Sequence, residues 1–92
     1  MIVRIMGDGQ YEVPDVHARA LNVHDDDVTR AVQAGDERGF AAALRGLLAE
    51  VRAVGERLPD SALDTSDVVL PEDGATLAEV LELVGPDGLL PG

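Results

Sequence analysis

The residues of this chain that most readily suggest chemistry are its two histidines. His17 and His24 are seven residues apart, and three aspartates follow at positions 25–27. Imidazole and carboxylate groups are frequent zinc ligands, but this spacing matches no common metal motif. The aspartate run also lacks the glycine and the closing glutamate of a calcium loop. We interpret these residues as helix caps and solvent-exposed side chains, and we expect no metal site.

A second candidate is Ser61, which follows Asp60. Acyl and peptidyl carrier domains are small and acidic, and they carry a phosphopantetheine arm on the serine of an Asp-Ser-Leu motif at a helix N-terminus. Here the leucine, Leu63, is displaced by one position and no helix is predicted after Ser61. A carrier-type domain modified on Ser61 is therefore kept as an alternative function.

The pattern of the remaining polar residues does not indicate an enzyme. The chain has no Cys, which excludes a disulfide framework, a thiolate metal site and a cysteine nucleophile. Carboxylates are so numerous that no pair stands out as an acid and base, and no Ser/His/Asp set has a supporting context. Gly7-Asp8-Gly9 precedes a second extended run and Pro14 rather than a helix, so it predicts a hairpin turn instead of a phosphate loop. We expect no catalytic residues and no cofactor.

The elements that position these residues begin with a β-hairpin. Alternating apolar residues predict strands over residues 2–6 and 10–13. A short helix over residues 16–22 is expected to end at Asn22 and the acidic run. One of the three aspartates then caps a second helix, which closes at Gly35.

The strongest periodic pattern lies in residues 37–57, after the predicted cap Asp36. Its apolar positions fall three and four residues apart and form one stripe: Phe40, Leu44, Leu47, Leu48, Val51, Val54 and Leu58. In a domain of this size the stripe is the expected centre of the core. The alternative is that it joins the coiled coil of a partner. The short connection at Gly35 predicts a helical hairpin with the preceding helix.

The last third predicts a loop and one short helix. Residues 67–71 are a candidate strand or an apolar tether, and Thr76 with Glu79 forms a capping box for the C-terminal helix. The predicted fold class is therefore α+β: a mostly helical single domain over residues 1–92. It has an N-terminal β-hairpin (1–14) packed on a helical hairpin (within 15–58), then an acidic loop with a short C-terminal helix (59–92). The hairpin edge is open in this prediction, and it offers a surface for a homodimer.

Charge is the clearest guide to partners. The net charge of the 92 residues is −11, and the residues from 60 onward include eight acids and no base. A field of one sign repels nucleic acid and anionic lipid, so we expect no nucleic-acid binding and no direct membrane insertion. No secretory signal is recognised, which favours the cytoplasm. The expected partner is a basic protein, and an acidic inhibitor or antitoxin-like protein is a further alternative. The candidate partner-binding residues are Asp64, Asp67, Glu72, Asp73, Glu79 and Glu82.

Almost the whole chain resembles one known family. The segments "RIMGDGQY", "AGDERGF" and "GLLPG" are the most specific parts of its resemblance to the PspA-associated protein family. This resemblance implies a cytoplasmic accessory protein of the phage-shock envelope-stress system. Its implied partner is PspA, a coiled-coil, membrane-remodelling protein that would recruit it to the inner face of the membrane. The resemblance supplies no catalytic or ligand residues.

Overall fold

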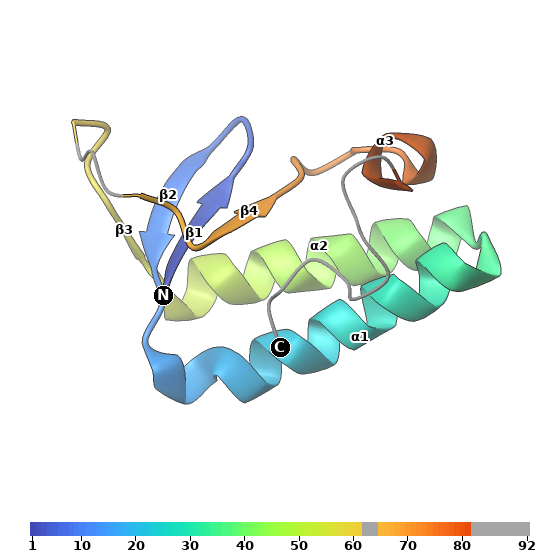
Figure 1. The fold of residues 1–92 in the computed structure, drawn as a ribbon, viewed down its shortest axis with the longest axis horizontal. Helices are drawn as coiled ribbons and strands as arrows, with labels where there is room; N and C mark the ends of the chain where they lie inside the picture. Colours follow the sequence, from blue (N-terminus) through green and yellow to red (C-terminus); the bar gives the residue numbers. More distant parts are fainter. Residues whose placement is uncertain (62–64, 82–92) are drawn as a thin grey trace.

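The fold joins a small sheet to a helical hairpin (Figure 1). The computed structural model describes residues 1–61 and 65–81. Its elements in chain order are β1 (Ile2–Ile5), β2 (Gly9–Glu12), the 3-10 turn η1 (Asp15–His17), α1 (Ala18–Ala34), α2 (Glu37–Val54), β3 (Glu56–Arg57), β4 (Val68–Leu70) and α3 (Leu77–Leu81). The predicted α+β class is confirmed.

The predicted opening hairpin is present, and its loop lies one residue earlier than the predicted Gly7-Asp8-Gly9. Ile5 pairs with Gly9, which leaves a three-residue loop between β1 and β2. Gly7 has a φ of +79° in this loop, a left-handed conformation that glycine adopts without a steric penalty.

The sheet is larger than the predicted hairpin. It has four strands in the order β3-β2-β1-β4. The pairs β1–β2 and β2–β3 are antiparallel, whereas β4 runs parallel to β1. Both edges of the hairpin are therefore paired within the chain, and neither is the open edge on which the homodimer prediction rested. Within the candidate segment 67–71, Val68–Leu70 form the strand β4.

The helix α1 corrects another expectation. It runs unbroken through Asn22 and the acidic run, where the sequence was interpreted as a break and a new cap. Leu21, Asp25 and Val28 follow one another at helical spacing on its buried face. Burial of one large aliphatic side chain contributes about 1.5–3 kcal/mol. Aspartate or asparagine in a helix costs less, roughly 0.7 kcal/mol or under against Ala, so the continuous helix is favoured.

The connection between α1 and α2 is as short as a helical hairpin allows. Gly35 ends α1 with φ 66°, and the amide N of Asp36 donates to the carbonyl O of Ala31 at 2.9 Å. Asp36 is at the same time the N-cap of α2, where its Oδ1 accepts from the amide of Gly39 at 3.0 Å. These two predicted caps are confirmed, and together they set the helices side by side (Figure 1).

Replacing Gly35 by Ala is expected to lower the free energy of unfolding by about 1–2 kcal/mol. A Cβ at this position meets no atom within 4 Å, so the cost comes from the left-handed backbone alone. Urea denaturation of the whole chain measures the change. Gly35→Asn is the matched control and should lose less, because asparagine tolerates this conformation better. Equal losses for Ala and Asn would contradict the backbone explanation.

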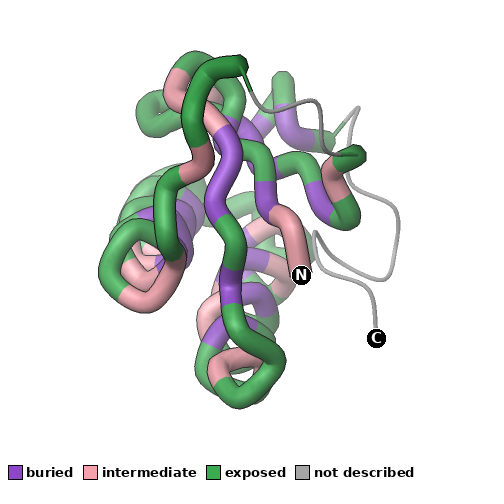
Figure 2. The backbone as a smooth tube through the Cα atoms, turned by 90° about the vertical axis from the view of Figure 1, so that its left-hand side faces the viewer, coloured by how far each residue is buried: buried purple, intermediate pink, exposed green. Residues whose placement is uncertain are grey.

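The core lies between the sheet and the helices. Buried and exposed positions alternate along β1 and β4, so one face of each strand turns inward (Figure 2). The predicted stripe of α2 is buried at Phe40, Leu44, Leu47, Leu48 and Val51, which are at most 1% exposed. The same cluster takes side chains from the strands, α1 and α3, including Val3, Ile5, Tyr11, Val13, Leu21, Val28, Val68, Leu70, Leu77 and Val80.

The helix α2 contains two glycines, Gly46 and Gly39, whose missing side chains leave room for different neighbours. A Cβ on Gly46 would lie 3.2 Å from His24 Nδ1, so this glycine allows close packing against α1. A Cβ on Gly39 would instead meet the carboxylate of Asp36, the cap of the same helix.

The helix α2 ends at Val54, earlier than the predicted residue 57. Gly55 has an extended backbone, and a Cβ there would lie 2.6 Å from the carbonyl O of Val51 and 3.1 Å from Tyr11 Cβ. The chain then enters β3, which pairs with β2. Leu58, the last member of the predicted stripe, is consequently outside the helix and only partly buried.

Candidate functional site

The candidate partner-binding acids lie on the segment that contains β4 and α3. Asp67 precedes β4, Glu72 and Asp73 follow it, and Glu79 lies within α3; all four are exposed. Asp64 and Glu82 were also predicted, and both fall outside the described residues.

Two of these acids have structural contacts. Asp67 Oδ2 accepts from the amide of Ile2 at 2.7 Å and so helps to align β4 with β1. Glu79 belongs to the cap of α3: its amide donates to Thr76 Oγ1 at 3.2 Å, and its Oε1 accepts from the Thr76 hydroxyl at 3.0 Å. The predicted pairing of Thr76 with Glu79 is confirmed.

Glu72 and Asp73 form a different kind of acidic site. They open a four-residue turn in which the amide of Ala75 donates to the carbonyl O of Glu72 at 3.1 Å and Gly74 has φ +90°. A glycine with positive φ at the third position is characteristic of a type II turn. Within the part of the chain that the structure describes, neither carboxylate makes a hydrogen bond or ion pair. We call residues 72–75 the acidic turn.

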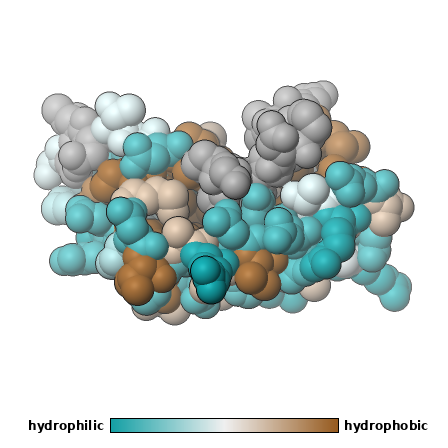
Figure 3. Space-filling model, turned by 60° about the horizontal axis from the view of Figure 1, so that its bottom comes forward, coloured by the Kyte–Doolittle hydropathy of each residue, from teal (hydrophilic) through white to brown (hydrophobic). Residues whose placement is uncertain are grey.

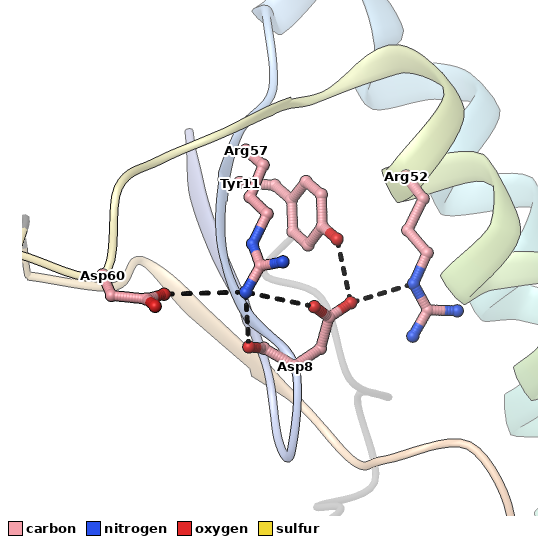
Figure 4. Close-up of polar contacts among 5 residues, drawn as sticks. All are labelled: Asp8, Tyr11, Arg52, Arg57 and Asp60. Atoms are coloured by element: carbon pink, nitrogen blue, oxygen red, sulfur yellow. Dashed lines mark hydrogen bonds and ion pairs between the residues drawn. The ribbon is translucent and has the colours of Figure 1, made fainter.

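A polar cluster that was not predicted from the sequence lies at the tip of the β-hairpin (Figure 4). Asp8 Oδ2 accepts from the Tyr11 hydroxyl at 2.8 Å and from Arg52 Nε at 3.0 Å. Arg57 donates to the carbonyl O of Asp8 at 3.0 Å, lies 3.7 Å from Asp8 Oδ1, and pairs with Asp60 at 3.6 Å. We call these five residues the Asp8 cluster. It ties the hairpin loop to the end of α2 and to β3.

Ionisation in the Asp8 cluster follows from these contacts. The hydrogen bonds from Tyr11 and then Arg52 hold the pKa of Asp8 below its ordinary value. Burial, followed by the hydrogen bond to the Asp8 carboxylate, raises the pKa of Tyr11. The hydrogen bond to Asp8 also raises the pKa of Arg52. At neutral pH the cluster therefore holds a carboxylate, a neutral phenol that donates, and charged guanidinium groups, which is an arrangement that stabilises the fold.

The Asp8 cluster could not be found from spacing. Asp8 was interpreted only as a turn residue, and 44 residues separate it from Arg52. A turn aspartate and an arginine at a helix end are each ordinary. Only the docking of the hairpin on the end of α2 brings them together.

The other candidates for chemistry are separated by the fold. His17 ends η1, whereas His24 lies within α1 against Gly46. Among the described residues, no three His, Cys, Asp or Glu side chains are grouped as metal ligands. Ser61 is exposed in a turn, residues 65–67 are irregular, and β4 follows. These described residues supply no helix for the carrier motif.

The described surface on the side of α1 is mostly hydrophilic. Figure 3 shows the side of the molecule on which α1 lies, where hydrophobic residues form small, separate patches. The large exposed hydrophobic residues before and within α1 are Val16 and Val23. None of the described helices combines the length and the apolar character that crossing a bilayer requires.

These features define a small α+β domain whose described polar clusters support the fold and whose acidic turn stays exposed. A family model described as PspA-associated protein matches residues 1–92. The chain therefore belongs to the PspA-associated protein family, as its resemblance implied. Neither the curated proteins nor the solved structures include a significant match to it.

Proposed function

We propose that this protein is a non-enzymatic accessory that binds a PspA-like coiled-coil protein through its acidic surface. The family match over the whole chain carries the choice of partner. The proposed location is the cytoplasm, with recruitment to the inner face of the membrane by the partner during envelope stress.

The burial of α2 narrows the surface available for this function. Its apolar stripe is enclosed between the sheet and α1, so the large side chains of the stripe are not available to join a coiled coil. Contact with the partner must then use side chains that the fold leaves in solvent. The acidic turn meets this condition, because Glu72 and Asp73 are exposed and make no polar contact among the described residues.

Charge supports a basic docking surface on the partner. The chain has a net charge of −11, and such a field accelerates encounter with a positively charged surface. Exposed charges attract over a range that added salt shortens. Binding that depends on the acidic turn should therefore weaken as the ionic strength rises.

Reversing both charges of the acidic turn, with Glu72→Lys and Asp73→Lys, is expected to weaken binding to a purified PspA-like protein on the order of tenfold, mainly through the association rate. Surface plasmon resonance at several salt concentrations measures this effect. Asp67 and Glu79 are left unchanged because they hold β4 and α3 in place.

The matched control reverses two exposed acids elsewhere, Glu12→Lys on β2 and Asp26→Lys on α1. It changes the net charge equally and should lower the association rate less. Equal losses in the two double variants would show that only net charge matters. Affinity that does not change with salt in the unmodified protein would contradict the acidic docking surface.

A further inference from the structure

An apolar groove lies between the hairpin tip and α3, next to the acidic turn. Met6, Pro71, Ala75 and Val80 supply its apolar lining, and Glu72 and Glu79 supply its carboxylates. Its volume is about 150 Å³. An engineered apolar cavity of roughly this volume accepts benzene, so the groove has room for one large apolar side chain.

One of the residues that line the groove is both apolar and exposed. Met6 is 49% exposed, although it directly follows the fully enclosed Ile5. Its amide donates to the carbonyl O of Leu70 at 3.0 Å, which holds the hairpin tip against the end of β4. Methionine is flexible and polarisable, and it is common on surfaces that adapt to a bound peptide. The exposed part of the Met6 side chain is in contact with water. A ligand that covers it would gain the free energy of burying this apolar surface.

Both carboxylate side chains line the groove together with its apolar residues. A Cβ on Gly7 would lie 2.9 Å from Glu72 Oε2, so the Glu72 side chain lies over the hairpin tip beside Met6. Glu79 is held on the α3 side by its contact with Thr76. An apolar hollow bordered by carboxylates complements an apolar side chain that is flanked by Lys or Arg.

We propose that this groove binds a basic segment of the protein partner, which inserts one large apolar side chain beside Met6 and pairs its cationic side chains with Glu72 and Glu79. The inference rests on the proposed function, because it specifies where the partner docks. It adds an apolar anchor to the acidic surface, and an anchor of this kind contributes most of the affinity in many interfaces.

The two methionines of the chain provide the test. Met6 lies in the groove, whereas Met1 precedes β1, and its amino group donates to the carbonyl O of Val13 at 3.0 Å. With methyl-labelled methionine in the full chain, the PspA-like protein should shift or broaden the Met6 resonance and leave that of Met1 nearly unchanged. The variant Met6→Leu assigns the signal.

A designed peptide tests the groove independently of that partner. The probe spaces Leu three and four residues apart with Arg between them, so that it presents a basic amphipathic helix. The peptide should shift the Met6 resonance, and Met6→Ser should weaken peptide binding by about tenfold. Glu72→Gln, which keeps the size of the side chain, should weaken peptide binding less. Val23→Ser, an exposed apolar change on α1, is the control and should have no effect.

Each outcome bears on one of the two proposals. If the PspA-like protein binds but neither moves Met6 nor responds to Met6→Ser, the groove is the wrong site and the proposed function stands. If that protein does not bind while the peptide moves Met6, the groove is supported and the proposed partner is wrong. A peptide that leaves Met6 unchanged, or an analogue with Glu in place of Arg that binds equally well, overturns the inference.

Discussion

Replacing Leu47 by Ala is expected to lower the free energy of unfolding by about 2–5 kcal/mol, the largest loss among our predictions. Leu47 is fully buried in the cluster that joins α2 to the sheet and α1. Truncation removes its apolar contacts and leaves a cavity that neighbouring side chains fill only in part. Because small domains are stable by only about 5–15 kcal/mol, the variant should unfold at a clearly lower urea concentration than the unmodified protein. Urea denaturation monitored by circular dichroism measures the loss.

A pair of valines on α1 provides the control for this core prediction. Val28 is fully buried and Val23 is 57% exposed, so Val→Ala at the two positions makes the same chemical change in the same helix. Val28→Ala should be clearly destabilising, whereas Val23→Ala should stay within about 0.5 kcal/mol of the unmodified protein. Comparable losses at both positions, or a stable Leu47→Ala variant, would contradict the buried core on which the proposed docking surface depends.

Replacing Asp8 by Ala is expected to lower the free energy of unfolding by about 1–3 kcal/mol at neutral pH. The change leaves the Tyr11 hydroxyl and the guanidinium of Arg52 without their shared acceptor. The Asp8 side chain is 21% exposed, which limits screening by water, whereas the Arg57 side chain is 52% exposed. Most of the loss should therefore come from the buried Tyr11, because the Arg52 side chain is 40% exposed and water also screens its ion pair. Thermal and urea denaturation measure it, with Asp26→Ala on the exposed face of α1 as the control.

The effect of Asp8→Ala should depend on pH. Because folding lowers the pKa of Asp8, its contribution is present above the ordinary aspartate value of 3.8 and is lost as the pH falls through the lower pKa of the folded state. The two proteins should therefore approach equal stability in acid. Folding raises the pKa of Tyr11 above 10.0, so a second loss in the unmodified protein begins above that pH. A stability difference that stays constant in acid would show that Asp8 acts without its charge.

Local signals predicted the elements with short-range causes. Gly7 and the flanking alternation identified the hairpin, and Gly35 with Asp36 identified the turn between the helices. The stripe from Phe40 to Val51 identified the core because its spacing admits one buried helix face. These features depend on residues close together in the chain, where backbone preference and periodicity act directly.

Competing local and long-range effects explain the errors. Aspartates at positions 25–27 are good helix caps, but burial of Leu21 and Val28 on one face keeps α1 continuous through them. Glu56 and Arg57 look like the end of an amphipathic helix, yet the close approach of Tyr11 to Gly55 turns them into β3. In both cases contacts distant in sequence outweigh the preference of the residues themselves.

The sequence by itself determined the composition of the core, the two helix caps between α1 and α2, the negative charge of the last third and the family to which the chain belongs. Only the tertiary structure decided that Asp67 and Glu79 help to hold β4 and α3, and that Met6 meets the acidic turn in one groove. The same is true of the Asp8 cluster. The physical reason is that charge and periodicity are properties of neighbouring residues, whereas a groove or a shared carboxylate requires distant segments to pack together.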